Sequence, residues 1–307
     1  MNDTSTFSAV GSSARVGRTA DPSPQVRPVG PTFGAEVRGM PIHGDVSPEL
    51  LMQFASLLHR YRVLIVPDLA LDPGDLVAFS RRFGPLEIHS RFENTLPAHR
   101  EVFCVGNVER DGMKASFSRG VEQWHADSSY RAMPSDASLF YGEMVPPEGG
   151  ETMFADATAA YRNLDAEMKR RIDGVFAVHS LETLRHWGQR QNPDRPVERS
   201  LVQEFPPARQ PLVRVHPVTG AKSLYLCPAV ISHIEGMPEA EGAALIDALT
   251  QHATQPRFVY SHRWLRGDLV MWDNRAVLHT ASLFDHTRYQ RLMYRTTLAG
   301  AAPGLAA

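Results

Sequence analysis

The sequence has few cysteines and no long apolar run. Cys104 and Cys227 are its two cysteines; they lie far apart and outside any CxxC pattern. This spacing argues against a thiolate-rich zinc or iron–sulfur site and favours two buried free thiols in a reducing compartment. No apolar run approaches the roughly 18 residues that a membrane-spanning helix requires. No basic segment followed by an apolar one marks a signal peptide. We therefore expect a cytoplasmic protein with no membrane partner.

The chain also lacks a strong excess of charge of either sign. Its formal net charge is −2, so composition gives no reason to expect a nucleic-acid partner. Hydrophobic residues make up 43% and charged residues 21%, which is typical of a globular protein. A chain of 307 residues can bury a sizeable core without a disulfide or a structural metal. A metal bound here is therefore predicted to be functional.

The chain divides into a polar N-terminal tail and one domain. Residues 1–26 are rich in Ser, Thr, Gly and Pro, which predicts a flexible tail before a domain over residues 27–307. Within the domain, Ser47 before Pro48 and Asp72 before Pro73 are typical helix starts. Apolar spacing predicts two more helices, over residues 156–173 and 239–253.

Short β-prone runs bounded by glycine and proline turns dominate the second half of the chain. The predicted strands are 35–37, 63–66, 102–105, 138–144, 152–155, 212–216, 223–227, 257–262, 269–272 and 292–298. Few alternate regularly with helices, so an antiparallel sandwich or barrel with flanking helices is predicted. The polar stretch 185–210 shows little periodicity and is expected to be structureless, either an active-site lid or a surface insertion.

The run Trp124-His125-Ala126-Asp127 is the strongest local signal of chemistry. In an extended segment, side chains two residues apart share a face, so His125 and Asp127 can grip one cation. His279, beyond a strand and a polar turn, can supply a third ligand. Two histidines and one carboxylate are diagnostic of non-heme iron(II) oxygenases. A lone HxD pair arises easily by chance, and His252, within a predicted helix, is expected to be an ordinary surface or capping histidine.

The wider sequence resembles the taurine dioxygenase / 2,4-dichlorophenoxyacetate dioxygenase family of Fe(II)- and 2-oxoglutarate-dependent oxygenases. The matching segments follow the family order from about residue 29 to residue 298, and the match is closer to the chlorophenoxyacetate branch. They are 79–85 (FSRRFGP), 124–129 (WHADSS), 146–152 (PPEGGET), 154–161 (FADATAAY), 215–217 (VHP), 267–279 and 291–297 (RLMYRTT). The resemblance implies a mainly β fold with flanking helices around a double-stranded β-helix, or jelly-roll, core. It also implies a single dioxygenase domain.

Carried over by motif position, the resemblance assigns roles to six residues. His125, Asp127 and His279 fall on the catalytic Fe(II) ligands. Arg291 falls on the arginine that pairs with the distal carboxylate of 2-oxoglutarate, for which a planar, permanently charged guanidinium is well suited. Thr152 falls on the residue whose hydroxyl contacts the same carboxylate. Arg295 falls on an arginine that helps to bind the anionic group of the primary substrate, and O2 is the second co-substrate.

Other positions are expected to shape the substrate pocket. His89 falls where the taurine branch has a substrate-contacting histidine, although a structural role in a loop is an open alternative. Phe92 replaces a tyrosine and Val121 an asparagine of that branch, which indicates a less polar pocket. His216 is expected to be structural. Residues 272–275 are expected to shape the strand end that aims His279.

The predicted activity is hydroxylation of an aliphatic C–H bond in a small anionic substrate, with release of succinate and CO2. The substrate is expected to carry a carboxylate, and the product could collapse with cleavage of a C–O or C–S bond. Desaturation or another oxidative tailoring of an amino-acid-like metabolite is an open alternative. A non-oxidative metal-binding jelly-roll protein is a remote one. The resemblance also implies a homo-oligomer, a dimer or a tetramer.

Overall fold

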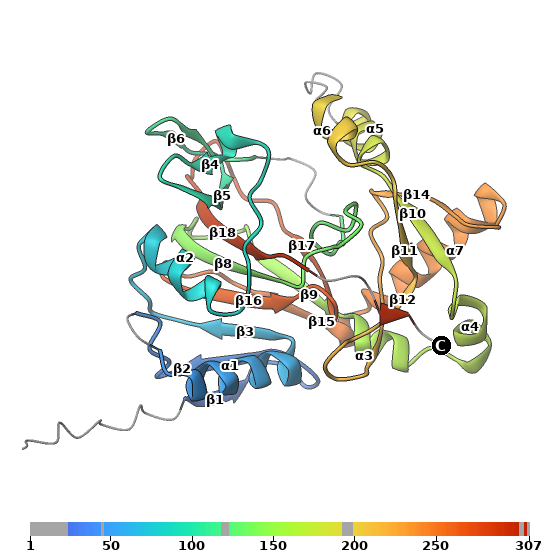
Figure 1. The fold of residues 1–307 in the computed structure, drawn as a ribbon, viewed down its shortest axis with the longest axis horizontal. Helices are drawn as coiled ribbons and strands as arrows, with labels where there is room; N and C mark the ends of the chain where they lie inside the picture. The colour runs from blue at the N-terminus through green and yellow to red at the C-terminus, as the bar shows by residue number, and fades with distance from the viewer. Residues whose placement is uncertain (1–23, 44–45, 118–122, 192–198, 301–303, 306–307) are drawn as a thin grey trace, which may run out of the picture.

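An eight-stranded sheet forms the centre of the computed structural model, which describes residues 24–43, 46–117, 123–191, 199–300 and 304–305 (Figure 1). Its neighbouring strands are antiparallel except for the pair β2–β3. In spatial order the strands are β1 (Gln25–Pro28), β2 (Ala35–Arg38), β3 (Val63–Val66), β16 (Leu269–Asp273), β8 (Ala137–Met144), β18 (Leu292–Leu298), β5 (His99–Gly106) and β4 (Thr95–Leu96).

A second sheet, of three strands, packs against one face of the large sheet. It consists of β15 (Val259–His262), β9 (Thr152–Asp156) and β17 (Val277–Ala281). The core between the sheets contains Phe154 from β9 with Trp272 from β16 and Phe140 from β8. Alternate residues of the central strands point the other way, since Met271 and Leu139 lie in a separate core. The central strands are therefore buried on both faces.

Two helices cover the outer face of the large sheet, α1 (Pro48–Tyr61) and α2 (Pro73–Arg81). The predicted caps are confirmed: the Ser47 hydroxyl accepts a hydrogen bond from the backbone N–H of Leu50, and Asp72 forms a reciprocal capping box with Asp75. Their apolar faces complete the outer core.

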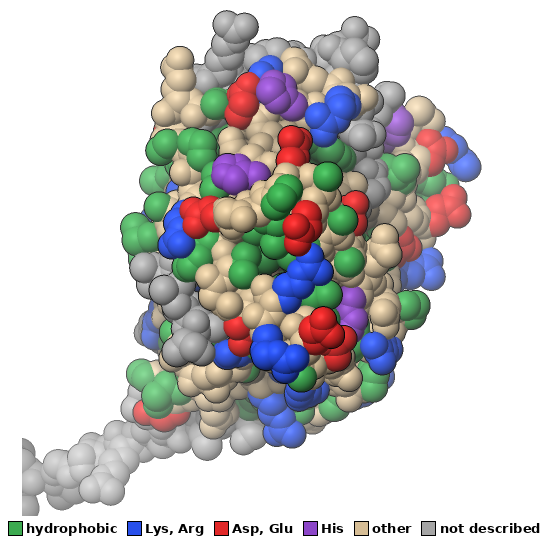
Figure 2. Space-filling model, turned by 90° about the vertical axis from the view of Figure 1, so that its right-hand side faces the viewer, with side chains coloured by type: hydrophobic (Ala, Val, Ile, Leu, Met, Phe, Trp, Pro, Cys, Tyr) green, Lys and Arg blue, Asp and Glu red, His purple; other side chains and the backbone are tan. Residues whose placement is uncertain are grey.

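A smaller unit lies beside the two sheets, on the right of Figure 1. Its strands are β10 (Phe176–His179), β11 (Ala208–Pro211), β12 (Val213–Val215), β13 (Lys222–Leu224), β14 (Ile231–Ile234) and β19 (Gly304–Leu305). Helix α7 (Glu239–Ala253), predicted over the same residues, packs on this unit. Acidic and basic side chains are interspersed over the face of the molecule shown in Figure 2. In this unit Arg209 pairs with Glu235, and Arg171 pairs with Glu241 of α7.

Several sequence-based boundaries were wrong, among them the ends of the strands predicted over 223–227 and 257–262, which are 222–224 and 259–262. The helix predicted over 156–173 is two helices, α3 (Ala157–Arg162) and α4 (Ala166–Ile172), because Asp165 caps a new start by accepting from the backbone N–H of Met168 at 2.7 Å. The stretch 185–210 is not structureless: it contains most of α5 (Leu181–Gln191), then α6 (Arg199–Glu204) and the start of β11. Strand β1 begins at Gln25, within the predicted tail; residues 1–23 lie outside the described part of the chain.

The remaining described elements are short. They are the hairpin β6 (Glu109–Arg110) and β7 (Met113–Lys114) and the 3-10 turns η1 (Phe92–Asn94) and η2 (Pro256–Phe258). In the described residues, no helix has the length and apolar character needed to cross a membrane.

Candidate metal centre and adjoining cavities

A backbone β-bridge joins His125 to His279 of β17, an outer strand of the second sheet. The N–H of His125 donates to the carbonyl of His279 at 3.0 Å, and the N–H of His279 donates to the carbonyl of His125 at 2.8 Å. Residues directly opposite each other in an antiparallel bridge point their side chains to the same face. The ring centroids accordingly lie 4.1 Å apart.

Asp127 completes a compact group of donor atoms with these two histidines. One donor atom from each of the three residues lies within 4.8 Å of the other two. Asp127 Oδ1 lies 3.9 Å from His125 Nε2, and Asp127 Oδ2 lies 3.9 Å from His279 Nε2. His125 Nδ1 is 2.9 Å from the carbonyl of Gln123 and must donate to it, which leaves the lone pair on Nε2, facing the group.

Asp127 is buried and makes three hydrogen bonds, two through its carboxylate and one through its backbone N–H. Oδ2 accepts from the Ser138 hydroxyl at 2.6 Å and Oδ1 from Arg295 Nη1 at 2.9 Å, while the backbone N–H donates to Asn274 Oδ1 at 3.2 Å. Burial alone would raise the pKa of Asp127, but Arg295 and the two histidines outweigh it and leave the pKa well below its ordinary value. Burial, with His125 nearby, lowers the pKa of His279 to about 3. At neutral pH the group therefore offers a carboxylate and a neutral buried imidazole, the forms that bind cations.

Arg291 lies at a separate cavity of about 160 Å³. The residue is 6% exposed, and its guanidinium makes a long hydrogen bond, 3.4 Å, from Nη2 to the carbonyl of Gly150. Nε has no partner among the described residues, and burial alone lowers the pKa of Arg291 to about 10. Gly150 has a φ of +72°, and a Cβ there would lie 3.4 Å from Arg291 Nε. The Gly-Gly turn thus leaves room for a buried guanidinium without a counter-ion among the described residues.

Thr152 begins β9, where it pairs with Ala281 of β17, two residues beyond His279. Its side chain is buried, and its hydroxyl oxygen accepts from the indole N–H of Trp264 at 3.0 Å. The hydroxyl hydrogen remains available to another acceptor.

A larger cavity of about 290 Å³ opens beside the three grouped residues. Arg295 and His89, both predicted to bind the substrate, line this cavity. The ring of Phe103 lies 4.3 Å from the His89 ring and 5.1 Å from the Arg295 guanidinium carbon. Phe92 is not among the lining residues and is 54% exposed, and Val121 lies outside the described residues.

The two cavities share part of their walls. Val105 and Ser116 line both of them. Leu184 and Trp187, from α5, close one side of the larger cavity. The predicted lid region therefore contributes to this cavity through Trp187, although as a helix rather than as a structureless loop.

The sequence did not single out Ser138, which donates to Asp127, or Phe103 and Tyr130, which line the larger cavity. Asn274 was expected only to help shape the strand end that aims His279, yet its Oδ1 also accepts from the backbone N–H of Asp127. Ser138 had no detectable signal, because one serine in a buried strand matches no motif. Both cysteines are buried free thiols, as predicted, and burial raises the pKa of Cys104 to about 12.

Comparison with known proteins gives consistent matches over nearly the whole chain. Residues 25–297 match the model of the family "Taurine catabolism dioxygenase TauD, TfdA family". The alpha-ketoglutarate-dependent 2,4-dichlorophenoxyacetate dioxygenase of Burkholderia sp. (strain RASC) is 36% identical over 282 residues, covering 87% of this chain and 92% of the relative. The (S)-phenoxypropionate/alpha-ketoglutarate-dioxygenase of Sphingobium herbicidovorans is 35% identical over 292 residues, covering 91% and 96%.

A solved structure shows the same fold. The crystal structure of AAD-2 in complex with Mn(II) and N-oxalylglycine superposes with a TM-score of 0.77 at 34% identity, covering 92% of this chain and 99% of AAD-2. This likeness confirms the predicted fold class, a jelly-roll core with flanking helices.

Proposed function

The chain belongs to the taurine catabolism dioxygenase TauD, TfdA family, and on that premise we propose that His125, Asp127 and His279 hold the catalytic Fe(II) of a 2-oxoglutarate-dependent dioxygenase. Fe(II) is the cofactor of such an enzyme, and 2-oxoglutarate and O2 are its co-substrates. The donor set supports the metal: two imidazoles and one carboxylate suit Fe(II) and leave coordination positions open. When bound, the metal and its co-substrates supply the oxidation of a C–H bond, with release of succinate and CO2.

Arg291 and Thr152 hold the distal carboxylate of 2-oxoglutarate in this proposal. A buried guanidinium without an anion among its described neighbours is costly, and a carboxylate that reaches it relieves that cost. The free hydroxyl hydrogen of Thr152 can donate to the same carboxylate. The cavity at Arg291 shares walls with the larger cavity, so a co-substrate held there lies next to the substrate.

The primary substrate is proposed to be a small carboxylate that carries an aromatic group. Arg295 supplies a cation at the wall of the larger cavity, and Phe103, Tyr130 and Trp187 supply aromatic surface. A cavity of about 290 Å³ suits a ring with a short side chain. The names of two relatives, a 2,4-dichlorophenoxyacetate dioxygenase and a phenoxypropionate dioxygenase, agree with this chemistry. The residues that line the cavity orient the reacting carbon and exclude water.

The observation that carries the proposal is the convergence of three donor atoms, together with Arg291, a buried arginine at the adjoining cavity that has no counter-ion among the described residues. The experiment is succinate release from 2-oxoglutarate in the presence of Fe(II) and an aryloxyalkanoate, with the matching alkylsulfonate and an uncharged methyl ester for comparison. We expect the carboxylate to be turned over fastest and His125→Ala to reduce turnover to the uncatalysed level.

A matched control is available in His252, whose Nε2 lies 2.9 Å from the carbonyl of Ala160 and which is not among the grouped donors or the residues lining either cavity. His125 also bonds one backbone carbonyl, so both alanine variants lose one such bond. His252→Ala should retain turnover. Full turnover by a folded His125→Ala variant would contradict the ligand assignment.

Two further properties stay predictions. Cytoplasmic localisation can be tested by fractionation of expressing cells. Assembly into a dimer or tetramer can be tested by sedimentation velocity, and a monomer at micromolar concentration would contradict it.

A further inference from the structure

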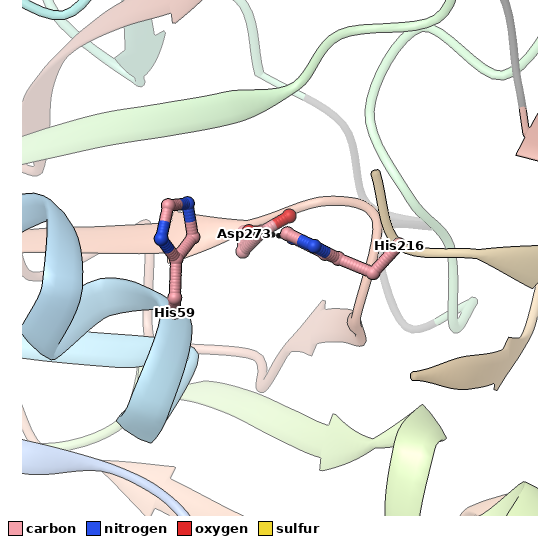
Figure 3. Close-up of side chains that lie close together, drawn as sticks. All are labelled: His59, His216 and Asp273. Atoms are coloured by element: carbon pink, nitrogen blue, oxygen red, sulfur yellow. Dashed lines mark hydrogen bonds and ion pairs between the residues drawn. The ribbon is translucent and has the colours of Figure 1, made fainter. Parts of the chain in front are cut away.

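A second group of possible metal donors, His59, His216 and Asp273, lies away from the proposed Fe(II) site (Figure 3). The hydrogen bonds show that it is not built to hold a cation. Asp273 Oδ1 accepts from the backbone N–H and Nε of Arg275, at 2.9 and 2.8 Å. Oδ2 accepts from Arg275 Nη2 at 2.8 Å and His216 Nε2 at 2.9 Å. These four bonds use the acceptor capacity of the carboxylate.

His216 offers no free lone pair toward Asp273. Its Nδ1 accepts from the backbone N–H groups of Val218 and Thr219, both at 3.2 Å, so the ring hydrogen sits on Nε2 and points at Asp273. His59 lies on α1, without a bond to either partner in Figure 3. Asp273, His216 and Arg275 therefore form a hydrogen-bonded clamp on the turn between β16 and β17.

The clamp fixes the residue that follows Asp273. The N–H of Ala276 donates to the Asp273 carbonyl at 3.0 Å, and the Ser223 hydroxyl donates to the Arg275 carbonyl at 2.6 Å. Between these anchors, the N–H of Asn274 donates to the carbonyl of Asp136 at 2.9 Å. The backbone of Asn274 is thus held on both sides, and its side chain is buried.

The side chain of Asn274 has one possible orientation. Its Oδ1 faces two groups that can only donate, the backbone N–H of Asp127 at 3.2 Å and the indole N–H of Trp272 at 2.9 Å. Its Nδ2 therefore faces the Ser138 hydroxyl, at 3.0 Å, and donates to it. A hydroxyl has one hydrogen, so Ser138 directs its own to Asp127 Oδ2, at 2.6 Å.

The hydrogen bonds of Asn274 thus lead to two of the proposed Fe(II) ligands, Asp127 and His279. Through its oxygen and through Ser138 it fixes the backbone and one carboxylate oxygen of Asp127. Through Trp272 it fixes an indole whose ring centroid lies 4.8 Å from that of His279. We propose that Asn274 is a positioning residue that sets the orientation of Asp127 and His279, and that Ser138 transmits its effect to the carboxylate. This proposal rests on the metal site of the proposed function.

Metal binding by the anaerobic protein tests the proposal without relying on turnover. Co(II), which reports its coordination in the visible spectrum, is titrated into wild type, Asn274→Ala, Ser138→Ala and the double variant. Loss of a residue that orients metal ligands typically weakens binding about 10- to 100-fold, and we expect Asn274→Ala to fall in this range with an altered Co(II) spectrum. The double variant should weaken binding by clearly less than the product of the two single effects, because both act through one hydroxyl.

Asn94→Ala is the matched control, because Asn94 is also buried and its Nδ2 donates to the carbonyl of Lys114 at 2.7 Å, outside this network. It should lower the unfolding midpoint but leave Co(II) affinity within about twofold of wild type. Unchanged affinity in Asn274→Ala, or multiplicative effects in the double variant, would overturn the proposal. If Asn274→Ala does not fold, unchanged affinity in Ser138→Ala overturns it. If wild type itself binds no Co(II), the proposed metal site fails.

Discussion

Substitution of Arg291 by Gln should measure separately how much the buried charge lowers the free energy of unfolding and how much it adds to the affinity for 2-oxoglutarate. Burial lowers the pKa of Arg291 to about 10, which corresponds to about 3 kcal/mol against the charged form in the ligand-free protein. The folded pKa lies below the unfolded one, so this penalty is fully present below about pH 10 and is relieved only as the pH rises above it. It therefore acts in full at neutral pH.

Glutamine removes the charge and loses few other contacts. The lost contacts are the 3.4 Å bond to the Gly150 carbonyl and the approach of the guanidinium carbon to the Phe140 ring, at 5.7 Å. We expect the free energy of unfolding of ligand-free Arg291→Gln to equal that of wild type or to exceed it by up to about 3 kcal/mol. The affinity for 2-oxoglutarate should fall by about 2–5 kcal/mol, or at least about 30-fold, because the carboxylate loses its buried partner.

Calorimetric titration with 2-oxoglutarate and urea unfolding with and without it measure both effects. Saturating 2-oxoglutarate, at 100 times its Kd, should stabilise wild type by about 2.7 kcal/mol and the variant by much less at the same concentration. Arg171→Gln, which loses an exposed pair with Glu241, is the control and should change neither quantity by more than about 1 kcal/mol. A destabilised Arg291→Gln protein with unchanged affinity would refute the reasoning.

Two further substitutions test the substrate site and the clamp. Arg295→Gln should raise the KM of an aryloxyalkanoate at least about tenfold and that of its methyl ester much less; equal effects in steady-state assays would argue against an anion contact. Asp273→Asn should lower the free energy of unfolding by about 3–5 kcal/mol at neutral pH, since it leaves Arg275 and His216 buried without their anion. Burial raises the pKa of Asp273, but Arg275 and His216 outweigh it and leave the pKa below its ordinary value. The stabilisation is thus present above about pH 4 and lost in acid, so urea titrations should show the two proteins converging as the pH falls; a constant gap would contradict this.

Sequence patterns predicted the parts of the fold that depend on residues close to one another in the sequence. The Ser47 and Asp72 caps fix helix starts within a few residues, and the continuous apolar run 269–272 matches a strand buried on both faces. The break between α3 and α4 was missed because Asp165 lies within a continuous apolar period, which hides a new cap. Helix α5 was missed because its face toward the cavity is short and the rest is polar.

Residues of the candidate site that belong to a sequence motif could be predicted, whereas residues that other strands bring to the site through packing could not. Residues 272–275 were expected to aim His279, yet Asn274 bonds the backbone of Asp127 directly and reaches His279 only through Trp272. Spacing along the chain says which residues share a face of one strand. It does not say which side chains from a different strand complete their hydrogen bonds, and Ser138 belongs to that class.

The backbone bridge between His125 and His279 has a consequence for the order of folding. The two residues lie far apart in the sequence, and their pairing requires β17 to have docked on β9. Contacts between such distant segments form late, because the intervening chain must first lose its freedom. A cation bound by both histidines therefore stabilises only the fully folded chain, and its binding free energy adds to the free energy of global unfolding. A fragment that ends before β17 lacks the third donor and gains nothing from the metal.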